Sequence, residues 1–214
     1  MNLNKIDFLC CTNNRLLLEE SAKSLQRLNT PNGFYTNLLT AENVQDITKA
    51  YNILMKESDA KYKIYLHQDV GILNKNFIYD IFKIFEDETI GMIGMCGCKK
   101  LPGNYTWWEG ECYGKVTEHR GSLNNLIFEQ PNGDYEEVES IDGLMMITQY
   151  DIDWNEQIKG FDFYDVSQCK EFQKKGLKIV VPKQENPWAM HVVNPRFNAE
   201  KYNSARLACK EIYK

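Results

Sequence analysis

The first hundred residues alternate between two hydrophobic periodicities, and this alternation limits the possible folds more than any other feature of the sequence. Short apolar runs typical of buried strands, such as IDFLCC (6–11) and YKIYLH (62–67), take turns with longer segments of helical spacing. In the segment AENVQDITKAYNILMKES (41–58), apolar residues recur at the spacing of one helix face. The pattern predicts an α/β layer fold.

The order of these segments predicts a mostly parallel sheet with helices on both faces. A short helical crossover returns the chain to begin the next strand in the same direction, so successive strand-helix units give parallel strands. Ligands of such sheets bind beyond the carboxyl ends of the strands. Further along the chain the predicted elements are a strand at IDGLMMIT (141–148), a helix at 163–176, a strand at 177–182 and a tail helix from about Asn198 to Tyr213.

Residues 98–140 interrupt this pattern and contain at most two short predicted strands. The segment is rich in Gly, Asn and aromatic residues, and long irregular segments of compact domains are commonly binding loops or lids. Its aromatic residues can stack on sugar rings or can form a small cluster that holds the loop in place; they are Tyr105, Trp107, Trp108 and Tyr113. We favour acceptor binding for this loop.

Charge and composition exclude several classes of protein. The 214 residues include 25 Lys and Arg against 30 Asp and Glu, a net charge of −5, which disfavours a general polyanion binder and predicts no nucleic-acid partner. The longest apolar runs are much shorter than the roughly 20 residues that span a bilayer, so no transmembrane segment is expected. Seven cysteines lie scattered in apolar stretches behind a start without a leader-like pattern, which predicts a cytoplasmic protein.

The cysteines also raise the question of a zinc site. Cys96, Cys98, Cys112 and His119 are candidate ligands, but the first pair has C-x-C rather than C-x-x-C spacing. Buried thiols are ordinary after an apolar strand. We therefore do not expect zinc at these residues.

Asp69 directly follows the predicted strand YKIYLH, in the segment YLHQDVG. An acidic residue at this end of a strand stands at the crevice where α/β sheets bind phosphates and metals. A hard divalent cation such as Mg²⁺ or Mn²⁺ takes one or two protein carboxylates and fills its remaining positions with phosphate oxygens and water. Asp69 is therefore a candidate cation ligand. The alternative is that its side chain only caps the following turn.

A series of segments runs in a characteristic order from about residue 6 to residue 193. They are AYNILMKESDAKYKIYLHQDVGILNKNFI, IGMIGMCGCKKLP with a Trp-Trp pair behind it, IDGLMMIT, FDFYDVSQCKEFQKKGLKIVVP and PWAMH. In this order they resemble a GT-A fold glycosyltransferase of the family-2-like group that includes the streptomycin-biosynthesis-type glycosyltransferase-like domain. The segments YLHQDV and FDFYDVSQ are the specific ones. The resemblance implies an α/β/α fold of three layers.

The resemblance also implies how a donor is bound. Such families hold a divalent cation on the donor diphosphate with an Asp-x-Asp motif, which here reads His67-Gln68-Asp69 and keeps only its last carboxylate. Asp69 is thereby implied as a ligand of Mn²⁺ or Mg²⁺. The implied nucleotide contacts are Thr12, Asn13, Asn52 and Gln68. For Asn52 the alternative is a structural hydrogen bond to the backbone.

Three further residues take roles from the resemblance. Asp165 matches the acidic residue that acts as base before this helix, and Asp162 is its nearest substitute; the alternative is a helix-capping role. Asp142 lies where the family lines the sugar and acceptor cleft, or is a turn residue. His191 matches a histidine that completes the metal site in several GT-A enzymes, or is a buried structural residue.

The resemblance implies a glycosyltransferase that moves a sugar from a nucleoside diphosphate, by family habit uridine diphosphate, to an acceptor hydroxyl with inversion. The acceptor is a saccharide or a small molecule, and polysaccharide biosynthesis is the implied setting. The alternative is an inactive protein of the same fold that binds nucleotide sugars. We expect one domain, 1–214, with a nucleotide-binding half at 1–98, an acceptor and catalytic half at 99–193 and a helical tail at 194–214. The short second half is compatible with a homo-oligomer in which a second subunit completes it.

Overall fold

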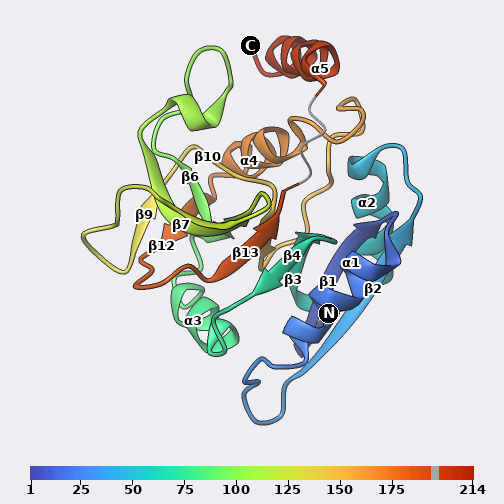
Figure 1. Ribbon diagram of the computed structural model, residues 1–214, viewed down its shortest axis with the longest axis vertical. Helices are drawn as coiled ribbons and strands as arrows, with labels where there is room; N and C mark the ends of the chain where they lie inside the picture. The colour runs from blue at the N-terminus through green and yellow to red at the C-terminus, as the bar shows by residue number, and fades with distance from the viewer. Residues whose placement is uncertain (194–197) are drawn as a thin grey trace.

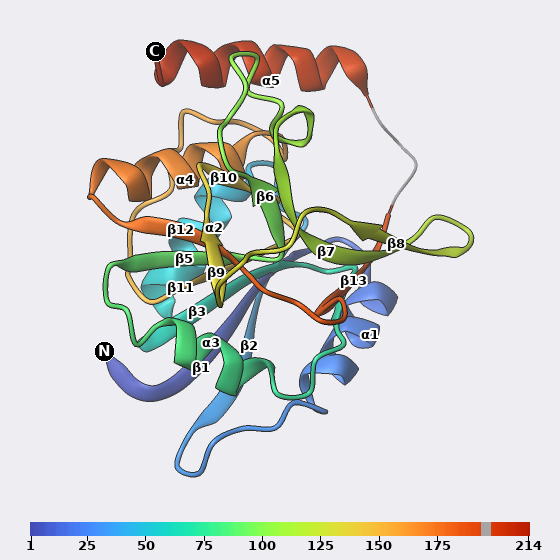
Figure 2. The ribbon, with the colours of Figure 1, turned by 90° about the vertical axis from the view of Figure 1, so that its left-hand side faces the viewer.

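The computed structural model describes residues 1–193 and 198–214, and its core is a seven-stranded sheet. Across the sheet the strands follow the order β2-β1-β3-β11-β5-β12-β9 (Figures 1 and 2). Their bounds in that order are Tyr35–Glu42, Asn2–Thr12, Ala60–His67, Met145–Thr148, Ile90–Gly94, Lys178–Pro182 and Tyr135–Glu137.

Helices cover both faces of this sheet, as the alternating periodicities predict. Successive residues of β1 point to opposite faces: Phe8 packs with α1 and α3 in one core cluster, whereas Leu9 packs with α2 and α4 in another. The predicted three-layer α/β/α arrangement is thus confirmed. The helices are α1 (Arg15–Leu25), α2 (Ile47–Glu57), α3 (Phe77–Ile84), α4 (Tyr164–Lys174) and α5 (Ala199–Ile212).

The sheet is less parallel than the sequence predicts. The pairs β1–β2, β1–β3 and β5–β12 are parallel, but β11 lies antiparallel between β3 and β5. The prediction of one strand over 141–148 is wrong, because the chain breaks after β10 (Ser140–Ile141) and β11 begins only at Met145. At the break, Asp142 donates its amide hydrogen to the carbonyl oxygen of Cys96 and its carboxylate accepts from the amide of Leu144. This Asx turn sends the chain from one sheet into the other.

A second sheet of six strands is built largely from the region that the sequence left irregular. Its order is β10-β6-β7-β13-β4, with β8 paired to β7. The expectation of at most two short strands in 98–140 is wrong, because β7, β8 and β9 all lie there. The strand β8 is exposed along its whole length, so no buried alternation marks it. The new bounds are β4 (Val70–Ile72), β6 (Cys96–Cys98), β7 (Cys112–His119), β8 (Leu123–Ile127) and β13 (Ala189–Val192).

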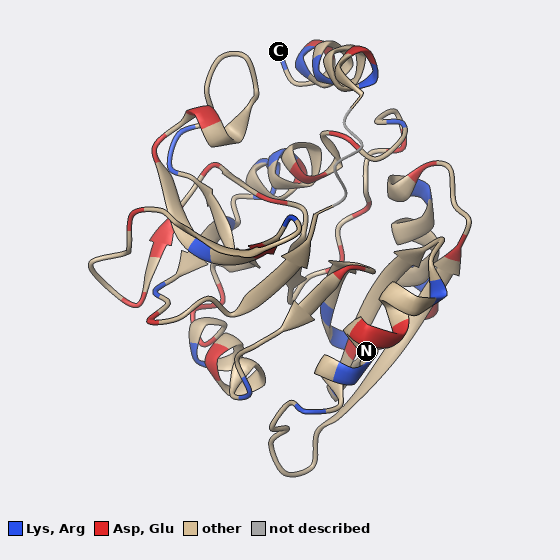
Figure 3. Cartoon of the chain, in the orientation of Figure 1, with Lys and Arg blue, Asp and Glu red and all other residues tan. Residues whose placement is uncertain are grey.

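The predicted tail helix is confirmed as α5, which begins after its cap residue Asn198. The first four residues of the predicted tail, 194–197, lie outside the described residues. Basic and acidic residues are interspersed along the helices α1, α4 and α5 (Figure 3). Across the two described stretches, no helix is both long and apolar enough to cross a bilayer.

Candidate active site

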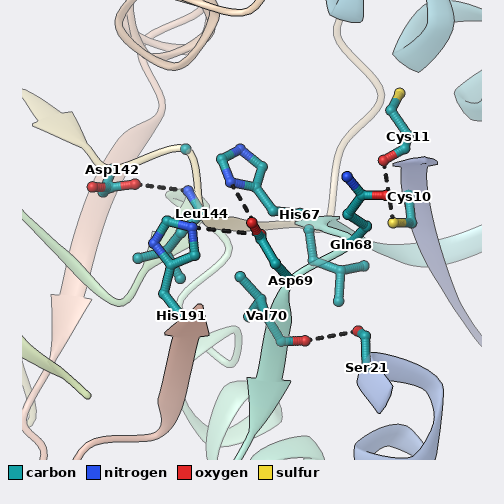
Figure 4. A network of polar contacts seen from close by, with 12 residues as sticks. Cys10, Cys11, Ser21, His67, Gln68, Asp69, Val70, Asp142, Leu144 and His191 are labelled. Carbon is teal, nitrogen blue, oxygen red and sulfur yellow. Dashed lines mark hydrogen bonds and ion pairs between the residues drawn. The ribbon is translucent and has the colours of Figure 1, made fainter. Parts of the chain in front are cut away.

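The ends of three strands bring His67, Asp69 and His191 together (Figure 4). His67 ends β3, Asp69 precedes β4, and His191 lies on β13, whose antiparallel pairing sets it opposite Val70 of β4. The carboxylate oxygen Oδ1 of Asp69 lies 3.5 Å from Nε2 of His191 and 4.0 Å from Nδ1 of His67. In the described part of the chain, this is the only group of three or more such ligands whose atoms lie close enough to hold one cation.

The strand that follows Asp69 is fixed by helix α1. The hydroxyl of Ser21 donates to the carbonyl oxygen of Val70 at 2.7 Å, and the hydroxyl of Ser24 accepts from the amide of Ile72 at 3.0 Å. On the other side, the amide of Val192 donates to the carbonyl oxygen of Asp69 at 2.9 Å. The backbone around the carboxylate is therefore held from two directions.

His67, Asp69 and His191 form a triad whose electrostatics suit a divalent cation. Oδ1 of Asp69 is buried and has no hydrogen-bond donor. Burial opposes ionisation of Asp69, but His191 and His67 outweigh it and lower its pKa. Burial and the neighbouring His191 lower the pKa of His67, which keeps this imidazole neutral and able to act as a ligand. Two imidazoles with one carboxylate are a donor set for divalent transition metals.

The pKa of His191 moves in the opposite direction to that of His67. Burial lowers it, but the contact with Asp69 more than offsets this and raises the pKa overall. A carboxylate and an imidazole at this separation therefore form an ion pair when His191 is protonated. A bound cation would compete with that proton, because a metal ligand must be deprotonated.

The predicted nucleotide contacts Thr12, Asn13 and Gln68 lie side by side at the carboxyl ends of β1 and β3. Oε1 of Gln68 accepts from the Thr12 hydroxyl at 2.7 Å and from the amides of Asn13 and Asn14 at 3.0 and 2.9 Å. Nε2 of Gln68 donates back to the Asn13 side chain at 2.8 Å. Gln68 therefore sets the shape of the turn between β1 and α1, and Asn14 caps that helix.

The structure does not bring Asn52 to this group. Its side chain is buried in α2 and donates to the carbonyl oxygen of Trp154 and to the carboxylate of Glu156, each at 2.9 Å. Its oxygen accepts from the amide of Trp154 at 2.8 Å. These bonds anchor the loop after β11, which matches the structural alternative for this residue.

A cavity of about 250 Å³ adjoins the triad, and Asp142 and Asp165 both line it. His67 lies on its wall, so the cavity and the triad share this residue. The remaining wall is mostly aromatic. It is contributed by the 105–108 loop, the turn before α4, the first residue of α4, and α5: Tyr105, Trp107, Trp108, Phe161, Phe163, Tyr164 and Tyr202. Of the four aromatic residues singled out in the loop, Tyr113 is not part of this wall.

The carboxylate of Asp165 is held by two backbone amides. It accepts from Val166 at 2.8 Å and from Gly143 at 3.1 Å. Burial, followed by the negative charge of Asp142, raises the pKa of Asp165 to about 7. Burial also raises the pKa of Asp162, the nearby acid. A carboxyl group that titrates near neutral pH is suited to accept and release a proton during a reaction.

Two roles at the site were not predicted from the sequence. His67 is a third member of the ligand triad, and Tyr164 is hydrogen-bonded to its Nε2. Gly143 packs against the Tyr164 hydroxyl. Phe163, just before α4, has φ of 61°, a left-handed conformation that non-glycine residues rarely adopt and that is often found at functional sites. The cysteines considered for zinc are buried and free.

In its fold the chain is similar to GT-A glycosyltransferases of known structure. TarS of S. aureus with UDP has a TM-score of 0.56 at 13% identity, over 89% of this chain and 61% of that one. PcManGT, a mannosyltransferase of Pyrobaculum calidifontis solved with GDP-Man and Mn²⁺, has a TM-score of 0.59 at 12% identity, over 100% and 65%. GalNAc-T7 with UDP, GalNAc and Mn²⁺ has a TM-score of 0.59 at 9% identity, over 90% and 44%.

Residues 7–213 match the sequence model of the glycosyltransferase-like family, and the chain belongs to this family. No curated protein matches the sequence. The chain spans less than two thirds of the length of the solved GT-A structures named above.

Proposed function

We propose that this protein transfers a sugar from a nucleoside-diphosphate sugar to an acceptor hydroxyl, with inversion at the anomeric carbon. The observation that carries the proposal is the position of His67, which faces Asp69 of the triad with one ring nitrogen and lines the Asp165 cavity. A diphosphate at the triad would place its attached sugar at the mouth of this cavity. The leaving group and the base would then lie on opposite sides of the sugar.

Asp165 is the base in this proposal. In the inverting reaction it takes the proton from the acceptor hydroxyl as that oxygen attacks the anomeric carbon and the bond to the diphosphate breaks. Its pKa of about 7 supports this role, because about half of the carboxyl group is then ionised at neutral pH and the carboxylate is basic enough to accept the proton. The amides of Gly143 and Val166 fix its orientation.

The donor is held at the carboxyl edge of the main sheet. Thr12, Asn13 and Gln68 contact the nucleotide, and Asp142 contacts the sugar. Asp69, His191 and His67 hold a divalent cation, which when bound supplies positive charge to the diphosphate leaving group. Uridine diphosphate is the first choice of donor, since the similar TarS structures contain UDP and UDP-GlcNAc; Mn²⁺ is the first choice of cation, since it is present with PcManGT and GalNAc-T7.

The acceptor enters the aromatic cavity. Ring faces such as those of Trp108 and Tyr202 pack well against the apolar face of a sugar, and a volume of about 250 Å³ suits a unit about the size of a monosaccharide. The acceptor is therefore a saccharide end or a small hydroxylated molecule, as in polysaccharide biosynthesis. Free cysteines fit a reducing compartment, and we place the reaction in the cytoplasm.

A screen of donors on the full chain tests this function. Thermal unfolding is measured with UDP, GDP and their sugars, each with and without Mn²⁺, and donor turnover is followed by release of the nucleoside diphosphate. The expected result is a cation-dependent stabilisation by one nucleotide and release of that nucleotide in wild type. No stabilisation by any nucleotide would overturn the proposal.

The second candidate is a nucleotide-sugar-binding protein without turnover. The observation in its favour is the motif His67-Gln68-Asp69, which has one carboxylate where the Asp-x-Asp pattern has two. Such a protein would be stabilised by the same nucleotide but would release no diphosphate from its sugar, with any acceptor or with water. The two measurements above separate it from an enzyme.

A further inference from the structure

The hydroxyl of Tyr164, in the first turn of α4, has two hydrogen-bonded neighbours. It donates a hydrogen bond of 2.9 Å to the carbonyl oxygen of Gly143. Its oxygen is also hydrogen-bonded to Nε2 of His67. A hydroxyl has a single proton and a carbonyl oxygen can only accept. Because the Tyr164 proton is used on Gly143, Nε2 of His67 must carry the hydrogen of the second bond.

This arrangement fixes the tautomer of the His67 imidazole. With hydrogen on Nε2, the neutral ring has a lone pair and no hydrogen on Nδ1. Nδ1 is the nitrogen that lies 4.0 Å from Oδ1 of Asp69, a buried oxygen that makes no hydrogen bond and has Nε2 of His191 as its other neighbour at 3.5 Å. A lone pair and a carboxylate oxygen thus face each other, and both are satisfied when a cation lies between them.

Gly143 makes this position of the tyrosine possible. A Cβ atom at residue 143 would lie 2.2 Å from the Tyr164 hydroxyl oxygen and 2.5 Å from the ring carbon that bears it. Any other residue would push the hydroxyl from its place between Gly143 and His67. The glycine next to Asp142 therefore has a packing role in addition to its place in the turn.

We infer that Tyr164 is a positioning residue, which through its hydroxyl holds His67 with Nδ1 free as a ligand for the divalent cation at Asp69 and His191. The inference rests on the proposed function for the purpose of that cation. The inference goes beyond the proposed function because it makes the third ligand, His67, depend on a residue of α4, the helix that also carries Asp165. The ring of Tyr164 lines the aromatic cavity, and the effect of Tyr164 on the cation is exerted through His67.

The tautomer can be measured directly on the full chain without metal. The protein has three histidines, so two-bond ¹H–¹⁵N correlation spectra of the labelled protein resolve each ring. In wild type we expect His67 to show a protonated Nε2 and an unprotonated Nδ1. In Tyr164→Phe, which keeps the ring and removes the hydroxyl, we expect a mixture of the two tautomers.

Tyr51→Phe is the matched control. Tyr51 is also buried, lies 6.2 Å from Tyr164 between ring centres, and donates its hydroxyl to the carbonyl oxygen of Leu66 at 3.4 Å. Tyr51→Phe removes a buried tyrosine hydroxyl and its longer hydrogen bond without touching the His67 ring nitrogens. Its His67 spectrum should match that of wild type.

Binding of Mn²⁺ alone, titrated by electron paramagnetic resonance, tests the consequence. Loss of an outer-shell partner typically weakens metal affinity about 10- to 100-fold, which is the change expected for Tyr164→Phe and not for Tyr51→Phe. Gly143→Ala should weaken Mn²⁺ in the same direction although the hydroxyl is retained.

Two results would overturn the inference: a wild-type His67 protonated on Nδ1, or equal Mn²⁺ affinity in wild type and Tyr164→Phe. A wild type that binds no Mn²⁺ would remove both the ligand role of His67 and the cation from the proposed function. Failure of sugar transfer in a protein that shows the expected spectra and Mn²⁺ binding would count against the proposed function alone.

Discussion

The carboxylate of Asp165 accepts a hydrogen bond of 3.1 Å from the backbone amide of Gly143, and this bond joins the start of α4 to the break between β10 and β11. Asp142, the residue before Gly143, thereby comes to line the same cavity as Asp165. Two carboxyl groups that share a cavity repel each other when both are ionised, which favours the protonated form of one. This relationship makes the proposed base testable.

Replacing the Asp165 carboxylate should remove turnover and spare donor binding. We expect Asp165→Asn to lower kcat by about 10²- to 10⁴-fold, the usual contribution of a general base. The dissociation constant of the nucleoside diphosphate, measured by calorimetry, should stay near that of wild type. Asp162→Asn is the matched control on the same turn, and an Asp162 variant that loses more activity than the Asp165 variant would reverse the assignment.

The pH dependence of the reaction should follow the pKa of Asp165. The base works when ionised, so kcat/KM should rise with pH and level off above the pKa of about 7. The charge of Asp142 raises that pKa by favouring the protonated form. Asp142→Asn removes the charge and should move the rising limb to lower pH, whatever it does to the maximal rate. A limb that stays in place would show that Asp142 does not act on this group.

Removing a triad ligand should weaken cation binding strongly. We expect Asp69→Asn and His191→Ala each to lower Mn²⁺ affinity by at least about 100-fold, more than the loss of an outer-shell partner. His119→Ala is the control, since His119 lies outside the triad. Chelation of the wild type should abolish nucleotide stabilisation, and a wild type that binds UDP equally well in chelator would contradict the role of the triad.

Asn52 should be required for stability and not for binding. Asn52→Ala removes three hydrogen bonds, two of them buried, and leaves the backbone of Trp154 without partners, at a cost of about 2–4 kcal/mol in the free energy of unfolding. Denaturant unfolding measures this cost. The exposed Asn124 offers a control, with a single weak contact at 3.4 Å to Ser122. A specific loss of nucleotide affinity in Asn52→Ala at unchanged stability would restore it as a nucleotide contact.

Helix α5 should influence the acceptor and leave the donor unaffected. Tyr202 packs on Phe163 and Trp108 with ring centres 4.8 and 5.6 Å apart and forms part of the cavity wall. Tyr202→Ala should raise the acceptor KM with little change in nucleotide affinity, as measured by initial rates. Leu207 on the same helix is 60% exposed, and Leu207→Ala should leave the acceptor KM and the nucleotide affinity unchanged. A raised donor KM in Tyr202→Ala alone would contradict this division.

The alternating periodicities predicted the three layers and the strands β1, β3 and β12 because these segments are buried and strongly patterned. Thr12 and Gln68 were assigned to the nucleotide by resemblance, and they lie together because the parallel strands β1 and β3 end at the same edge of the sheet. A strand was predicted in the region of β11, but its antiparallel direction was not, since a short apolar run has no signal for direction. The exposed β8 was missed because it has no buried face to produce alternation.

Site residues that directly follow a predicted strand could be found from the sequence. Those whose position depends on the pairing of strands far apart in the chain could not. Asp69 follows β3 and can be found from the sequence. The contact of His191 with Asp69 depends on the β13–β4 pairing, and His191 was placed there only by resemblance. The role of Tyr164 depends on its hydroxyl proton going to Gly143 and not to His67, which no spacing rule describes. Asn52 was assigned to the nucleotide because a buried amide and a ligand-binding amide look alike in sequence.

The place of β11 has a consequence for how this protein reaches its native state. The strand β11 (residues 145–148) lies between β3 and β5 in the main sheet, and it is synthesised long after both of these neighbours. The first hundred residues therefore cannot close their own hydrogen-bond ladder. Such long-range pairing slows folding, since the chain must order a large loop before the contact stabilises it. We expect the two halves of the sequence to fold and unfold cooperatively rather than in turn.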